Sequence, residues 1–411
     1  MSLVTGLPSL SVPSACLRHP RSGSGTFAVR QRGALLLRRS SAANEDRILI
    51  LGGGIIGVSV AYHLALRGRR ATVVDHAGIA SCASGKAGGF LARDWNDGTP
   101  LSALTRKSFD MHAEVAKELN LKSYRRLRCK AVTVGGDMSK PASRKLASLE
   151  WVDTGAQGER FMGDESTIAQ VHPKDLTEAM WKACQDKAGS EFRLGTVNEV
   201  LTEDVGEGKR VKGALVNGEE VLADTVVCCM GPWSGVLQLL HPQLQVYGVK
   251  YHSVLLQSKR VLSEAVFFNG LGNPEVYPRG NGENYITGFP DPPVVVSETP
   301  GQVQVRENVC ERLITTVRTV SGDMQSAELT GKQSCYLPFT ADSLPAMGKL
   351  PWLQGGFVCV GHGCWGILNS LASGLGMSEL IVDGEATSVD IAPFNVDRLL
   401  SDYEPEWAPS R

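Results

Sequence analysis

The sequence predicts an α/β fold in which a parallel-sheet domain is interleaved with a lobe of antiparallel β-sheet and one helix. Three observations predict this fold. A buried strand, a glycine turn, a helix and a second strand follow one another within residues 47–75. Short strand-like segments, two of them joined by an Asn-Gly hairpin signal, precede another apolar strand over residues 195–230. An antiparallel pattern over residues 247–337 then precedes a last apolar strand and helix, over 357–382.

The first glycine turn has the spacing of a dinucleotide-binding site. Its glycines stand in GxGxxG order: the first permits a tight turn, the second lets the backbone approach a pyrophosphate, and the third lets the helix lie close to the strand. Free N–H groups at the start of that helix favour an anion. The residues predicted to bind the dinucleotide here are Gly52, Gly54, Ile55, Ile56 and Gly57.

Asp75 ends the second predicted strand, 18 residues after Gly57, where a carboxylate can accept hydrogen bonds from ribose hydroxyls. Strand, turn, helix, strand and acid occur in order within 29 residues, so the motif predicts a dinucleotide site rather than an incidental glycine turn. The motif alone does not separate NAD from FAD. The meander predicted before the strand at 223–230 argues against a simple NAD-type Rossmann domain and favours a flavoprotein.

Composition describes an ordinary globular protein with an unusual N-terminal segment. The 411 residues are 42% hydrophobic and 21% charged, and no apolar stretch approaches the roughly 20 residues that span a bilayer. Residues 1–44 hold six arginines, eight serines and no acid, which predicts an organelle-targeting presequence; a disordered tail is the alternative. The serine and proline content favours a plastid over a mitochondrion, and a cytoplasmic location stays open.

Charge and cysteine usage exclude several classes of site. Beyond residue 44 the chain has 36 basic and 43 acidic residues, a net charge of −7, so nucleic acid binding is not expected. Its ten cysteines form no CxxC pairs or His/Cys clusters, so neither a zinc site nor a disulfide framework is expected. We therefore expect no metal and a small-molecule substrate; the oligomeric state is left open.

Further segments follow from local pattern. Residues 80–90 are almost all small, which predicts either a flexible loop or a backbone cradle that passes close to a flat cofactor. Residues 137–165 are polar and irregular in pattern. Helices are expected over 101–120, 174–187, 302–320 and 368–382. Strands are expected over 129–135, 195–201, 210–216, 219–222, 249–257, 265–268, 276–279, 285–288 and 357–360.

Together these segments resemble the D-amino-acid oxidase/sarcosine oxidase/glycine oxidase family of FAD-dependent oxidoreductases, over residues 47–398. The most specific signatures are GGGIIGVSVAYHLALRG, ASGKAGGF, VVCCMGPWS, FTADSLPAMG and GHGCWGILNSLASG. Within the family the chain is similar to a poorly characterised eukaryotic branch that carries GHxCWGILN. The resemblance implies bound FAD, with the glycine turn and Asp75 on its ADP half.

The resemblance also implies further cofactor contacts. It places the ASGK segment near the flavin, Val197 beside the adenine, and the turn after the last strand along the pyrimidine edge of the flavin. The additional residues implied to bind FAD are Ser84, Gly85, Lys86, Val197, Gly231, Trp233, Gly361, Gly363, Gly366 and Ile367.

The family chemistry is hydride transfer to flavin N5 from a carbon next to nitrogen. The resemblance thus implies an enzyme that oxidises a C–N bond of a small amine or imino/amino acid. Members that act on amino acids usually carry Arg or Lys after the GH, where it binds the substrate carboxylate, but this chain has Cys364 and Trp365 there. A flavoprotein with weak catalysis that serves as a binding or regulatory module is the alternative; an NAD-dependent dehydrogenase is disfavoured.

Several side chains are candidates for the substrate side of such a site. The catalytic candidates are Trp365, His362 and Arg279, with Lys250 and Arg93 as other cations that could replace the missing clamp. Each has a structural alternative: a packed aromatic ring, a histidine bonded to the turn, or a solvated surface charge.

Cys335 stands seven residues before Asp342, the spacing at which the sarcosine oxidase branch bonds a cysteine covalently to the flavin. Tyr336 and Leu337 depart from that branch. They favour FAD held without a bond and Cys335 as a buried thiol near the flavin, with a covalent link as the alternative.

The predicted domain division follows the same pattern. The expected parts are a presequence at 1–44, an FAD-binding domain of 45–110, 166–246 and 335–400, a substrate lobe of 111–165 and 247–334, and a tail at 401–411.

Overall fold

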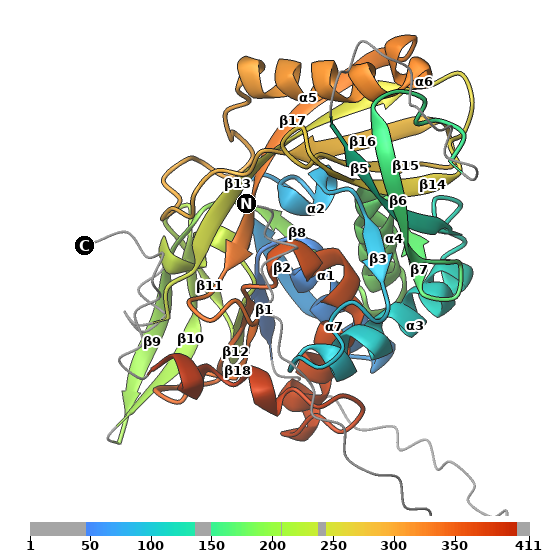
Figure 1. The fold of residues 1–411 in the computed structure, drawn as a ribbon. Helices are drawn as coiled ribbons and strands as arrows, with labels where there is room; N and C mark the ends of the chain where they lie inside the picture. The colour runs from blue at the N-terminus through green and yellow to red at the C-terminus, as the bar shows by residue number, and fades with distance from the viewer. Residues whose placement is uncertain (1–46, 136–148, 207, 237–243, 401–411) are drawn as a thin grey trace, which may run out of the picture. The chain divides into compact units, whose positions relative to one another are not determined.

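Two large β-sheets, one mostly parallel and one mostly antiparallel, organise the chain (Figure 1). The computed structural model describes residues 47–135, 149–206, 208–236 and 244–400. The presequence and tail predicted at 1–44 and 401–411 lie outside the described residues.

The mostly parallel sheet has six strands in the order β18-β20-β12-β1-β2-β8, and β18 is the strand that runs antiparallel to its neighbour. Along β1, alternate side chains enter the apolar cores on the two faces, so the strand is buried on both sides. The bounds are β1 Ile48–Leu51, β2 Ala71–Asp75, β8 Glu191–Leu194, β12 Thr225–Cys228, β18 Ala346–Lys349 and β20 Gly356–Val360.

Helices α1, α3, α4 and α7 pack on one face of this sheet. Helix α7 lies close to α1 because Gly374 has no side chain: a Cβ there would come within 2.6 Å of the Ser59 backbone. Both helices begin just after a parallel strand ends, so their N-termini meet at one edge of the sheet. The bounds are α1 Ile55–Leu66, α2 Ala83–Lys86, α3 Ser102–Glu118, α4 Pro173–Ala188 and α7 Gly366–Asp383.

A small sheet of β9, β10, β11 and β19 packs on the other face. Asn217 and Gly218 join β10 to β11 with φ of 52° and 81°, the left-handed backbone that a type I′ turn requires. The predicted hairpin and meander are thereby confirmed. The bounds are β9 Val197–Val205, β10 Gly208–Val216, β11 Glu219–Leu222 and β19 Leu353–Gln354.

The mostly antiparallel sheet has seven strands in the order β17-β13-β16-β15-β14-β5-β6. Helix α5 covers one of its faces (Figure 1). The face that carries Phe267, Tyr277 and Tyr285 is called the inner face below. The bounds are β5 Arg128–Val134, β6 Ala156–Gly163, β13 Tyr247–Gln257, β14 Glu264–Asn269, β15 Glu275–Pro278, β16 Glu283–Gly288, β17 Glu328–Phe339, α5 Glu307–Val320 and α6 Gly322–Gln325.

Short elements complete the fold. A three-stranded sheet in the order β3-β7-β4 is formed by the segments that connect the two large sheets along the chain. The bounds are β3 Phe90–Ala92, β4 Arg125–Arg126, β7 Ile168–Gln170, and the 3-10 turns η1 Gly231–Val236, η2 Gly363–Trp365, η3 Ala392–Phe394 and η4 Val396–Leu399. No helix within the described ranges is both long and apolar enough to cross a membrane.

The structure corrects the predicted elements in several places. Strands β3, β7, β17 and β18 were not among the expected strands. The helix expected over 302–320 begins only at Glu307, because side chains outside the helix bind the preceding N–H groups: Gln304 N donates to Glu298 and Arg306 N donates to His252. Strand β6, in the segment expected to be irregular, and β8 were not predicted. Both are partly exposed edge strands with many polar residues, so their apolar alternation is weak.

The boundary expected between residues 110 and 111 falls inside α3. Residues on both sides of it contact α7: Ser108 Oγ accepts from Ala372 N at 3.1 Å, and His112 Nε2 lies 3.0 Å from Ile367 O. The whole of α3 therefore packs with the helices on the parallel sheet.

Candidate cofactor and substrate site

A cavity of about 510 Å³ lies where the parallel strands end and helices α1 and α7 begin. It is lined by residues from the first βαβ unit, the ASGK segment, the β8–β9 connection, the turn after β12 and the turn after β20. The predicted residues that line it are Gly52, Gly54, Ile55, Ile56, Asp75, Ser84, Val197, Gly231, Trp233, Gly361, His362, Gly363, Gly366 and Ile367. Segments more than 300 residues apart in the sequence thus meet at one cavity.

The three glycines of the first turn differ in their surroundings. Gly52 has φ of 113°, and a Cβ there would lie 2.3 Å from the Cys229 carbonyl oxygen. A Cβ on Gly57 would lie 2.0 Å from the Gly52 carbonyl oxygen. Gly54 instead has one near neighbour, Ser84 Oγ at 3.2 Å. Gly52 and Gly57 therefore permit the turn and the helix packing, whereas Gly54 leaves space at the helix N-terminus.

The N-terminus of α1 faces this cavity without a side-chain cap from Gly54. Ser84 supplies an acceptor from another element: Ile55 N–H donates to Ser84 Oγ at 2.8 Å. The hydroxyl thus marks where an anion would meet the free amides at the start of α1. This arrangement fits a pyrophosphate, and Ser84 would stand beside it.

Asp75 holds the turn together as well as lining the cavity. One carboxylate oxygen accepts from Gly53 N at 2.8 Å, and the other accepts from Ala77 N at 2.8 Å and Gly78 N at 2.9 Å. The side chain therefore fixes the glycine turn to the loop after β2. Its predicted contact with ribose hydroxyls stays a prediction beside this structural role.

His362 is buried in the second glycine turn. Its Nε2 lies 3.0 Å from Ser373 Oγ, and burial lowers the pKa of the imidazole to about 3. The ring is therefore neutral at physiological pH and too weakly basic to take up a proton there. This geometry fits a residue that positions the turn on α7, and the catalytic role of His362 stays a prediction.

Some predicted cofactor residues support the cavity wall from behind. A Cβ on Gly85 would meet the Ala80 carbonyl oxygen at 1.9 Å, so Gly85, like Gly57, serves close packing. Lys86 Nζ donates to Ser334 O at 3.2 Å and lies near Cys335. Burial nevertheless raises the pKa of the Cys335 thiol to about 12, so the thiol is protonated.

Trp365 belongs to an aromatic cluster rather than to the cavity lining. Its ring packs against the inner face of the seven-stranded sheet and meets Trp95 edge-on at 6.2 Å. The same cluster contains Phe90, whose ring stacks on Tyr277 at 5.1 Å. The loop after β20 is thus fixed against the inner face.

The candidate cations are all engaged elsewhere. Arg279 forms an ion pair with Glu283 and donates to Ala87 O at 3.3 Å. Lys250 Nζ lies 3.0 Å from Glu298, and the Arg93 side chain lies on the surface 2.9 Å from Asp110. Arg279 is therefore paired with Glu283, and its catalytic role stays a prediction. In the part of the chain that the structure describes, no Lys or Arg lines the cavity.

One wall of the cavity was not predicted. Residues 296–300 line it, and Glu298 anchors them by accepting from Lys250 Nζ, from Tyr336 OH and from Gln304 N, the last at 2.8 Å. Trp233 Nε1 donates to the Glu298 carbonyl oxygen at 2.7 Å, which joins this segment to the turn after β12. The contacts link distant segments, so no local pattern in the sequence could have indicated them.

Comparisons with known proteins agree with this geometry. Residues 47–380 match the family described as FAD dependent oxidoreductase (DAO). The Schizosaccharomyces pombe protein named "Putative oxidoreductase C1F5.03c" is 30% identical over 381 residues, covering 85% of this chain and 97% of that protein. The crystal structure of glycine oxidase from Geobacillus kaustophilus is similar with a TM-score of 0.69 and 24% identity, covering 85% of this chain and 98% of that one. That of L-proline dehydrogenase from P. horikoshii is similar with a TM-score of 0.71 and 18% identity, covering 86% and 97%. This chain therefore belongs to the DAO family of FAD-dependent oxidoreductases.

Proposed function

We propose that this FAD-dependent oxidoreductase oxidises a C–N bond of a small amine or imino/amino acid. The observation that carries the proposal is that both glycine turns, at residues 52–57 and 361–366, line one cavity beside the aromatic inner face of the antiparallel sheet. Glycine oxidase and L-proline dehydrogenase, which share the fold, are named for substrates with a C–H bond next to nitrogen, and this supports the same chemistry here.

The described residues fit FAD. Gly54, Ser84 and the first amides of α1 would hold the pyrophosphate, and Asp75 would contact the ribose. Gly363, Gly366 and Ile367 would contact the flavin ring. Bound FAD supplies a two-electron acceptor for hydride from the carbon next to nitrogen.

The protein's own contribution is to hold the reacting groups and to exclude water. The N-terminus of α7 points its first N–H groups at the cavity, where they can stabilise negative charge. The rings of Phe90, Trp95, Tyr277 and Trp365 form one cluster, which Trp365 joins to Cys364 in the loop that lines the cavity. A substrate there would be shielded from solvent and oriented by the surfaces of these rings.

Anaerobic bleaching of the flavin tests the proposal. The purified protein with its FAD is mixed with a panel of primary and secondary amines, imino acids and amino acids, and absorbance is followed. We expect at least one class to reduce the flavin. A flavin that dithionite reduces but no member of the panel reduces would contradict the proposal and favour a binding or regulatory module.

A further inference from the structure

The inner face of the seven-stranded sheet carries an acid among aromatic residues. Strand pairing sets Tyr277 opposite Tyr285 and Glu275 opposite Thr287, so all four side chains lie on one face. The Tyr277 and Tyr285 rings stack at 5.9 Å with an angle of 4° between their planes. The intervening Val276 lies on the opposite face, buried in the core beneath α5. Glu275 therefore lies on the inner face with these rings, as does Glu283 at the other end of the same hairpin.

Glu275 has no cationic partner among the residues with described positions. Its carboxylate accepts a hydrogen bond from Tyr277 OH, and no Lys, Arg or His in those ranges forms an ion pair with it. The other carboxylates near the site are occupied: Glu298 pairs with Lys250, Glu283 pairs with Arg279, and Asp75 accepts from backbone amides. Glu275 is half-buried, and a carboxylate that protein surrounds without a counter-ion is costly, so its presence suggests that a cation completes the site.

Glu275 lies beside the loop that lines the cofactor cavity. Cys364 lines the cavity, and Tyr251 lies on the inner face, because it stands two residues before Ser253, which pairs with Thr287. The charge of Glu275 acts on both side chains. Glu275 is half-buried and Cys364 is exposed, so both side chains retain accessible surface. Trp365, next in the loop, packs on the same inner face. One acid and several rings of the inner face thus lie beside this loop.

The protonation of Glu275 agrees with this environment. Burial raises the pKa of its carboxyl to about 7, while the hydrogen bond from Tyr277 opposes the shift. The titratable groups that face it are Tyr251, Tyr277, Cys129 and Cys364, none of which is cationic. A positively charged ligand would therefore stabilise the carboxylate form. Aromatic rings beside it add attraction for a cation.

We propose that Glu275, with the rings of Tyr251 and Trp365, binds the positively charged nitrogen of the substrate, and that the substrates are amines without a carboxylate. This inference rests on the proposed C–N oxidation and narrows its substrate class. The lining of the cavity gives a second line of support for this substrate class, because no Lys or Arg among its described residues is available to bind a carboxylate. An amino acid would bring an unpaired negative charge close to Glu275.

The first experiment compares matched pairs on the wild-type holoprotein. Pyrrolidine is paired with proline, and benzylamine with phenylglycine, so the members of each pair differ by the carboxylate. Binding is measured from the perturbation of the flavin spectrum, and reduction from anaerobic bleaching. We expect each amine to bind and bleach at concentrations at least tenfold lower than its amino acid. Amino acids that bind and bleach better than the amines would overturn the substrate class while leaving C–N oxidation intact.

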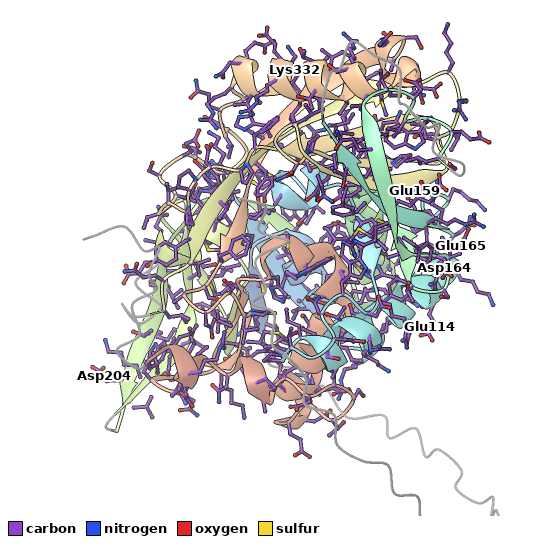
Figure 2. The ribbon with its side chains drawn as sticks, viewed as in Figure 1. Glu114, Glu159, Asp164, Glu165, Asp204 and Lys332 are labelled. Carbon is purple, nitrogen blue, oxygen red and sulfur yellow. The ribbon has the colours of Figure 1, made fainter. Side chains whose placement is uncertain are left out.

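The second experiment replaces the acid. Glu275→Gln keeps the shape but removes the charge, and loss of one charge-assisted contact should raise the dissociation constant of the amine by about 10- to 100-fold. Its FAD content and the binding of uncharged benzyl alcohol should not change. The matched control is Glu165→Gln, whose exposed side chain lies at the periphery beyond β6 in Figure 2.

Unchanged amine binding in Glu275→Gln would refute the role of Glu275. Equal weakening of benzyl alcohol and amine would also refute it, because it would show damage to the site rather than loss of a charge contact. If neither amines nor amino acids bleach the flavin, the proposed function fails, and the comparison of amine binding between wild type and Glu275→Gln still decides whether Glu275 binds cations.

Discussion

Gly54 faces the cavity, whereas Gly57 packs against the back of the same turn. Gly54→Val should therefore fold and lose FAD, because its side chain meets little protein and fills the space of the pyrophosphate. Gly57→Val should lose the fold, because its Cβ would lie 2.0 Å from the Gly52 carbonyl oxygen. Flavin absorbance and circular dichroism of both variants check this. Stoichiometric flavin in Gly54→Val would contradict the role of Gly54 in leaving space for the pyrophosphate.

Asp75 stabilises the glycine turn, since three backbone N–H groups donate to its carboxylate. Asp75→Asn replaces one acceptor oxygen by an amide donor, so we expect a loss of about 2 kcal/mol in the free energy of unfolding and weaker FAD binding. Chemical denaturation of the apoprotein measures the first effect. Asp186→Asn, in an exposed pair with Lys182 on α4, is the control and should change stability little. Equal stability of Asp75→Asn and wild type would show that the turn does not depend on this carboxylate.

The Cys335 thiol is buried and protonated, so it lacks the thiolate needed to attach a flavin. We expect acid precipitation of the holoprotein to leave the flavin in the supernatant. Yellow colour that stays with the precipitate, and that Cys335→Ser releases, would instead establish the covalent link.

At the scale of elements, the contact between α1 and α7 sets where the two helix N-termini meet the cavity. Gly374→Ala would place a Cβ within 2.6 Å of the Ser59 backbone, so the helices must separate. We expect a loss of about 1–3 kcal/mol in the free energy of unfolding, together with weaker FAD binding. Gly158→Ala on β6 is the control, because a Cβ there meets nothing within 4 Å. Wild-type stability and FAD affinity in Gly374→Ala would contradict this account of how α1 and α7 pack.

Elements with a strong local pattern could be predicted from the sequence. The first βαβ unit, the hairpin at Asn217 and the final strand and helix combine apolar periodicity with glycine turns, and all of them are present. Strands β6 and β8 could not be predicted, because edge strands bury too little for a regular apolar pattern. The start of α5 depends on acceptors from Glu298 and His252, which no local sequence rule includes.

In the candidate site, too, the residues set by local pattern could be predicted and those set by distant contacts could not. Most predicted glycine-turn residues line the cavity, because a glycine turn between a strand and a helix is a local feature. Arg279 and Lys250 looked like free cations in the sequence, but their partners Glu283 and Glu298 are set by hairpin geometry and by the packing of a distant loop. The place of Glu275 on the inner face depends on strand register, so the sequence alone did not single it out.

At the scale of the whole molecule, buried histidines predict acid sensitivity. Burial lowers the pKa of His63, His112 and His252 to about 4 and that of His362 to about 3. Between these values and the unfolded pKa of about 6.5, the unfolded chain binds more protons than the folded chain, so stability rises with pH in that window. The raised pKa of Glu275 has the opposite effect, because it favours the folded state as the pH falls. It is a single group and opposes the effect of several histidines.

We therefore expect the free energy of unfolding to fall as the pH drops from 6.5 to 5, by on the order of 1–2 kcal/mol for each buried histidine. Urea unfolding at saturating FAD, repeated at several pH values, measures the slope. His112→Gln keeps a donor for the carbonyls at the start of α7. It should reduce the slope of the free energy of unfolding against pH by the contribution of about one proton. A stability that does not change over this range would contradict the neutral buried state of these rings.

The most direct test of C–N oxidation is the rate of anaerobic flavin bleaching by the best amine of the panel, measured in a single turnover with hydrogen or deuterium on the carbon next to nitrogen. We predict that the flavin bleaches, that deuterium slows the bleaching several-fold because this C–H bond breaks, and that a carbonyl product appears in proportion. Bleaching at the same rate with either isotope and without a carbonyl product, or no bleaching of a flavin that dithionite reduces, would contradict it.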